Sequence, residues 1–123
     1  MRRILILDDE PAVLNALRRT LRAAFAQEDV VIEVFDEPEA AVLRAGEQDF
    51  DVVISDYRMP GLNGAEATGA VLAAAPETKV ICLTASVTSE EIDEVLAAGA
   101  IACMTKDGDF DLLVRKVCEA ASA

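Results

Sequence analysis

The stretch LILDDEP, residues 5–11, places a buried-looking apolar run directly before three consecutive acids and a proline. Ile4 to Leu7 form the short apolar run that is typical of a buried strand. Asp8, Asp9 and Glu10 follow at once, although three neighbouring carboxylates repel one another. A single acid before Pro11 would suit a helix N-terminus, but three acids are poorly explained by capping. The stretch therefore predicts a strand whose end carries acids with a further task.

The same order of a short apolar run and a longer segment with helical spacing occurs five times along the chain. The helical segments begin with favourable signals: Pro11 and Pro38 suit a first turn, and Thr88 to Glu91 form a capping box. Gly46 and Gly99 are expected to end the second and fourth helices. Such an alternation predicts an α/β domain, a doubly wound parallel sheet with helices on both faces. The expected strands cover residues 3–7, 30–35, 51–55, 79–83 and 101–105.

Composition narrows the class of protein further. The 123 residues are 53% hydrophobic and carry a formal net charge of −12, which predicts one compact domain over residues 1–123 that nucleic acid and anionic membranes repel. No apolar run approaches the roughly 20 residues of a membrane span, and three separated cysteines indicate reduced thiols, so we expect a cytoplasmic protein. The chain has no histidine, which excludes Ser-His-Asp and Cys-His nucleophilic sites and His-ligated zinc.

Polar side chains follow four of the expected strands at the point where each ends. Asp8 to Glu10, Asp56, Thr84 and Lys106 hold these positions, and the carboxyl ends of parallel strands meet at one edge of a sheet. Carboxylates without Cys or His select a hard cation, Mg²⁺ before Ca²⁺. A magnesium ion with a lysine and a hydroxyl suits phosphoryl transfer. Asp56 is the candidate nucleophile, while Asp8 and Asp9 hold the ion.

Four motifs together resemble the receiver domains of bacterial two-component response regulators. They are ILILDDEP, VVISDYRMPGLNG, VICLTAS and AGAIACMTKD, and they follow one another in order over essentially the whole chain. The resemblance implies a flavodoxin-like (βα)5 fold with strand order 2-1-3-4-5. It also implies phosphorelay signalling, in which Asp56 accepts a phosphoryl group from a histidine kinase or phosphotransfer protein. Such a domain is no enzyme beyond catalysing its own phosphorylation and dephosphorylation.

The resemblance also implies roles for individual residues. Asp9, Asp56 and the main-chain carbonyl of Arg58 would bind Mg²⁺ directly, and Asp8 would act mainly through water. Lys106 would pair with the phosphoryl group and Thr84 would turn inward to bond it, with Ala85 in the same phosphoryl-binding and switch segment. Arg58 and Ser86 would set the rate of phosphoryl loss. Cys103 departs from the family, because it stands where receivers often carry a switching aromatic residue.

Partners are implied in the same way. Arg18, Arg19 and Arg22 form a basic outer face on the first helix, which we interpret as a docking face for the phosphoryl donor. The surface of the fourth helix, fifth strand and fifth helix is the family's usual output face. This face would act on an effector or on an output domain outside this chain, and a fused output domain could bind DNA. The receiver itself would be a monomer or a weak homodimer.

Two other functions are compatible with parts of the sequence. A Mg²⁺-dependent aspartyl phosphohydrolase would use the same nucleophile, but such enzymes usually place an acid two residues after it, where Arg58 stands here. A receiver fold that acts only as a phosphorylation-independent interaction module would have lost an acid, Thr84 or Lys106. All of these residues are present, so the phosphorylated receiver is the favoured reading.

Overall fold

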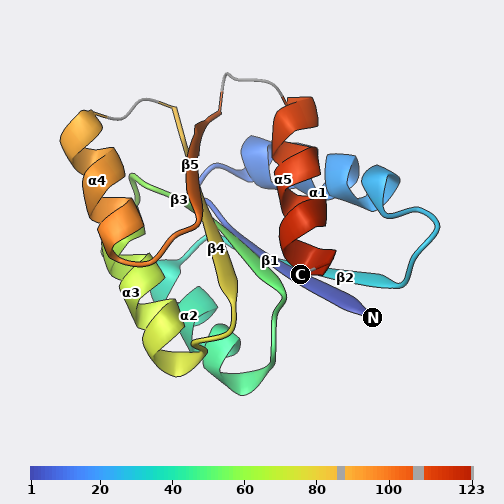
Figure 1. The fold of residues 1–123 in the computed structure, drawn as a ribbon, viewed down its shortest axis with the longest axis horizontal. Coiled ribbons are helices and arrows are strands. Elements are labelled where there is room, and N and C mark those ends of the chain that lie inside the picture. Colours follow the sequence, from blue (N-terminus) through green and yellow to red (C-terminus); the bar gives the residue numbers. More distant parts are fainter. Residues whose placement is uncertain (86–87, 107–109, 123) are drawn as a thin grey trace.

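The computed structural model describes residues 1–85, 88–106 and 110–122 of the chain (Figure 1). Strands and helices alternate throughout, as the repeated pattern predicts. The strands are β1 (Arg2–Leu7), β2 (Val30–Phe35), β3 (Val52–Asp56), β4 (Lys79–Thr84) and β5 (Ala102–Thr105). The helices are α1 (Pro11–Ala24), α2 (Pro38–Glu47), α3 (Gly64–Ala74), α4 (Ser89–Ala97) and α5 (Phe110–Ser122).

The strands form one parallel sheet in the order β2-β1-β3-β4-β5, which confirms the predicted flavodoxin-like topology. Helices α1 and α5 cover one face of the sheet, and α2, α3 and α4 cover the other (Figure 1). The strand order reverses between β1 and β3, and in open α/β sheets the crevice at such a point is where ligands bind.

The core has one layer on each side of the sheet, because successive strand residues point to opposite faces. In β1, Ile4 and Ile6 pack with the helices α1 and α5, whereas Leu5 and Leu7 pack with α2, α3 and α4. All four side chains are at most 1% exposed. Burial on both faces explains why the apolar runs of β1 (Ile4 to Leu7) and β3 (Val52 to Ile54) are continuous rather than alternating with polar residues.

Several element ends differ by one residue from the sequence prediction. β3 begins at Val52, one residue later than expected. Asp51 still bonds to β1: its main-chain nitrogen donates to the Arg3 carbonyl at 2.9 Å, and its carboxylate accepts from the Arg3 nitrogen at 2.9 Å. The expected end of α2 at Gly46 is wrong: the helix continues to Glu47, and the nitrogen of Gln48 still donates to the carbonyl of Arg44.

The predicted boundaries of α4 are confirmed. The Thr88 side chain accepts from the Glu91 nitrogen, and the Glu91 carboxylate accepts from the Thr88 nitrogen at 3.0 Å, which is a capping box. At the other end Gly99 has a φ of 115°, a conformation that favours glycine. The helix therefore begins and ends where local sequence signals place it.

Candidate functional site

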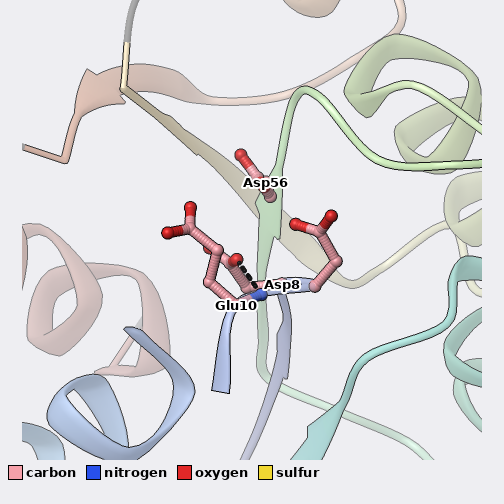
Figure 2. Close-up of side chains that lie close together, drawn as sticks. Asp8, Glu10 and Asp56 are labelled. Atoms are coloured by element: carbon pink, nitrogen blue, oxygen red, sulfur yellow. Dashed lines mark hydrogen bonds between the residues drawn. The ribbon is translucent and has the colours of Figure 1, made fainter. Parts of the chain in front are cut away.

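Acidic side chains meet at the carboxyl edge of the sheet, on the two strands beside the reversal of strand order. Asp8 follows β1, and Asp56 is the last residue of β3, which pairs with β1 (Figure 2). Asp8, Asp9, Glu10 and Asp56 each offer a carboxylate oxygen, and these oxygens lie within 4.8 Å of one another. The sequence prediction that Asp8, Asp9 and Asp56 come together is therefore confirmed.

Lys106 links these acids. Its Nζ lies 2.8 Å from Asp8 Oδ2, 2.8 Å from Glu10 Oε1 and 3.3 Å from Asp56 Oδ2. Its main-chain nitrogen donates to the carbonyl of Thr84 at 2.6 Å, which joins the end of β5 to the end of β4. The lysine is thereby held over the acids by the strand that precedes it.

Helix capping does not account for the three acids after β1. Glu10 is the N-cap residue of α1, but its side chain makes no capping hydrogen bond. The Asp8 carboxylate instead accepts from the main-chain nitrogen of Glu10 at 2.9 Å, the dashed line in Figure 2, while its other oxygen contacts Lys106. The acids thus face the site rather than the helix.

Burial makes the negative charges of this cluster costly. Asp56 is 4% exposed, and burial together with the charge of Asp8 raises its pKa to about 6. Burial also raises the pKa of Asp8, although Lys106 opposes the shift. Burial works against the charge of Lys106, but its bonds to Asp8 and Glu10 outweigh that effect and raise its pKa. One ammonium is therefore shared among three carboxylates.

The donor set fits a hard divalent cation. Asp8 and Asp56 are buried, Asp9 is exposed at the rim, and every candidate ligand is an oxygen. Such ligands suit Mg²⁺, which is bound through one or two carboxylates and keeps waters that phosphate oxygens can replace. Asp8, Asp9 and Asp56 are the side chains that could hold it. The Arg58 carbonyl as a ligand stays a prediction.

The remaining predicted site residues lie around this cluster. Thr84, 1% exposed, ends β4 beside β3, and the exposed Ala85 follows it. Ser86 lies outside the described residues. Cys103 is half-buried on β5 and pairs in register with Cys82, so a small thiol fills the position of the family's switching aromatic residue.

The predicted basic residues are divided between two places. On α1, Arg19 and Arg22 are exposed, and the half-buried Arg18 donates to Asn15 at 3.2 Å. Arg58 lies after β3, where its guanidinium contacts Glu91 of α4 at 3.0 Å. The roles of these residues in docking and in phosphoryl loss stay predictions.

Sequence reasoning missed several residues that the structure places at or beside the site. Glu10 was part of the acidic run, so its chemistry was visible, but its contact with Lys106 depends on the fold. Tyr57 donates to Glu94 at 3.2 Å, and Arg58 contacts Glu91, over separations of 37 and 33 residues. No local signal in the sequence marks such pairs.

The chain is an α/β domain built on a parallel sheet. Its acidic site, at the carboxyl edge of the central strands, is suited to a hard cation. The family model for the response regulator receiver domain matches residues 4–118. The chain therefore belongs to the receiver domain family of two-component response regulators.

Similar proteins agree with this assignment. The chain is 34% identical over 117 residues to the transcriptional regulatory protein LnrK of Bacillus subtilis, covering 95% of this chain and 52% of that protein. It is 32% identical to the response regulator GacA of Pseudomonas viridiflava, covering 95% and 54%. The chain thus spans about half the length of these relatives.

Solved structures show the same fold. The signal receiver domain of NarL from Mycobacterium tuberculosis superimposes with a TM-score of 0.79 and 28% identity, covering 99% of this chain and 97% of that one. The BeF3-activated DrrB receiver domain gives a TM-score of 0.82 and 25% identity, covering 100% and 99%. Within the described residues, no helix has the length and apolarity that crossing a membrane requires.

Proposed function

We propose that this chain accepts a phosphoryl group on Asp56 from a phosphohistidine of a histidine kinase or phosphotransfer protein. The main support for this proposal is that Asp56, Asp8 and Lys106 lie together at the carboxyl edge of the sheet. In the transfer an Asp56 carboxylate oxygen attacks phosphorus, the P–N bond breaks, and the donor imidazole keeps the electron pair. Histidine must come from the partner, because this chain has none.

The residues of the site suit this reaction. Asp8 and Asp9 with Asp56 would hold Mg²⁺, which when bound offsets negative charge on the transferred group. Lys106 already contacts Asp56 and supplies an ammonium for the phosphoryl oxygens. Thr84 ends the neighbouring strand and would supply its hydroxyl, with Ala85 beyond it. Burial of Asp56 restricts water around the nucleophile.

The direct test is the intact mass of the protein after incubation with acetyl phosphate. We expect one phosphoryl adduct when Mg²⁺ is present and none when a chelator removes it. A protein that gains no adduct and also fails to bind a beryllium fluoride mimic with Mg²⁺ would contradict the proposal. A protein that binds the mimic but gains no adduct would be tested next with a phosphorylated histidine kinase as donor.

The lifetime of the adduct should depend on Arg58. An Arg58→Asn protein should lose its phosphoryl group severalfold faster, because a long cationic side chain two residues after Asp56 would shield the group from water and bind its oxygens. The measurement is the decay of the adduct mass after the donor is removed. An unchanged half-life would exclude Arg58 as a determinant of this rate.

Docking of the donor should depend on the arginines of α1. We expect Arg18→Glu with Arg22→Glu to slow phosphoryl transfer from a histidine kinase about tenfold or more, because electrostatic steering accelerates association. Transfer from acetyl phosphate should stay unchanged. Arg2→Glu, at the amino end of β1, is the control. If Arg2→Glu slowed transfer from the kinase as much as the α1 double variant does, a specific docking face would be ruled out.

The length of the relatives bears on the output of this receiver. Relatives that are about twice as long are named transcriptional regulatory proteins and response regulators. We propose that residues 1–123 are one receiver domain whose α4, β5 and α5 surface acts on an effector or on an output domain beyond this chain, DNA-binding where fused. A cytoplasmic location belongs to the same proposal. So does a monomer or weak homodimer, which light scattering with and without the beryllium fluoride mimic would test.

A further inference from the structure

One carboxylate oxygen of α4 serves two partners. Glu91 Oε1 accepts from the Thr88 main-chain nitrogen at 3.0 Å, which caps the helix, and it also accepts from Arg58 Nη2 at 3.0 Å. Arg58 belongs to the loop that leaves β3 two residues after Asp56. The start of α4 is therefore bonded to the cation that lies closest in the chain to the phosphoacceptor.

A second bond joins the same loop to α4 in a different way. The Tyr57 hydroxyl donates to Glu94 Oε2 at 3.2 Å, and the Tyr57 carbonyl accepts from the Gly64 nitrogen at 2.7 Å. Tyr57 is 6% exposed, whereas the Arg58 side chain is 64% exposed. The tyrosine is thus held at both ends, and the arginine side chain has room to move.

Phosphorylation would create a stronger partner for Arg58. The phosphoryl group brings between one and two negative charges and three acceptor oxygens, which guanidinium groups bind in bidentate fashion. Lys106 cannot meet this charge alone, because it already contacts Asp8, Glu10 and Asp56. An exposed ion pair such as Arg58 with Glu91 is weak, so a phosphoryl group could displace it.

We propose that Glu91 and the phosphoryl group on Asp56 compete for Arg58. Without phosphate, Glu91 holds the guanidinium against α4. With phosphate, Arg58 turns to the phosphoryl oxygens. Of the side-chain bonds that join this loop to α4 within the described residues, only the one between Tyr57 and Glu94 then remains. This inference rests on the proposed function. It supplies a route from the site to α4 that needs no aromatic residue at Cys103.

Competition makes a specific prediction for affinity. Changing Glu91→Gln keeps the capping box, which glutamine also forms, but removes the charge that retains Arg58. The freed guanidinium should then tighten binding of beryllium fluoride with Mg²⁺ two- to fivefold, the range expected from an exposed ion pair. Arg58→Asn should weaken binding, and Glu91→Gln should add nothing in that background.

The chain offers a convenient reporter for this experiment. Tyr57 is its one tyrosine and there is no tryptophan, so tyrosine emission reports on the residue next to Asp56. Beryllium fluoride would be titrated into the parent, the two single variants and the double variant in Mg²⁺. Glu90→Gln is the matched control, because it removes an equal charge from the same turn of α4.

The outcomes separate the inference from the proposed function. Tighter binding by Glu91→Gln that disappears with Arg58→Asn, while Glu90→Gln changes little, supports the competition. Two results would overturn the competition while leaving the proposed function intact, provided that the parent binds beryllium fluoride. In the first, Glu91→Gln changes the affinity equally in the parent and in the Arg58→Asn variant. In the second, Glu91→Gln changes the affinity in neither protein. A parent protein that binds no beryllium fluoride contradicts the proposed function and the competition with it.

Discussion

An Asp56→Asn protein should gain no mass from acetyl phosphate, and without metal it should unfold at a higher temperature than the parent. The first result follows because the amide has no nucleophilic carboxylate oxygen. The second follows because a buried carboxylate next to Asp8 is a destabilising charge at neutral pH. The pKa of Asp56 is about 6 in the folded protein against an ordinary value of 3.8, so its ionisation costs folding about 2–3 kcal/mol above pH 6.

The pH dependence of this effect has a definite sign. Between pH 3.8 and about 6 the folded state binds more protons at Asp56 than the unfolded state does, so the contribution of Asp56 to stability falls as pH rises. At pH 7.5 the asparagine variant should therefore melt about 10 °C above the metal-free parent. The difference should shrink towards pH 4, which differential scanning calorimetry at several pH values would measure.

Magnesium should reverse the order of the melting temperatures, so that the parent melts above the Asp56→Asn variant. Bound Mg²⁺ offsets the charges of Asp8 and Asp56, so it should raise the melting temperature of the parent and much less that of Asp56→Asn. Lys106→Met is the complementary variant: it leaves three acids without their ammonium, so it should melt below the metal-free parent and gain more from Mg²⁺. An Asp56→Asn protein less stable than the parent without metal would contradict this account of the site.

Gly64→Ala should destabilise the protein by about 3 kcal/mol, near the upper end of the range for overpacking. A Cβ atom at Gly64 would lie 2.8 Å from the Tyr57 Cα and 3.1 Å from the Asp56 carbonyl oxygen, both of which are backbone atoms that cannot turn aside. The Gly64 nitrogen also donates to the Tyr57 carbonyl at 2.7 Å. The alanine would push apart the start of α3 and the end of β3, so phosphoryl uptake at Asp56 should fall as well.

Gly69 is the matched control in the same helix. A Cβ atom there meets nothing within 4 Å, and alanine favours helix more than glycine does by about 1 kcal/mol, so Gly69→Ala should stabilise the protein slightly. Urea unfolding of the two variants and the parent makes the comparison. If Gly64→Ala were as stable as Gly69→Ala, the close approach of α3 to the end of β3 would not be a constraint.

The fold was predictable because its signals are local and repeated. Short apolar strands before amphipathic helices, prolines in first turns and the capping box at Thr88 all act within a few residues. The errors are confined to element ends, where a distant partner decides. The Asp51 carboxylate, just before β3, accepts a hydrogen bond from the main-chain nitrogen of Arg3, which is 48 residues away, and no property of the strand's own residues indicates this bond.

The amino-acid sequence by itself determined the receiver architecture and the presence of Asp8, Asp9, Asp56 and Lys106 at strand ends, because the order of strands brings their carboxyl ends to one edge. Only the tertiary structure decided how these charges are shared: that Glu10 joins Lys106, that burial raises the pKa of Asp56, and that Arg58 pairs with Glu91. Burial and long-range pairing depend on distances between segments far apart in the chain. Local patterns carry no information about those distances.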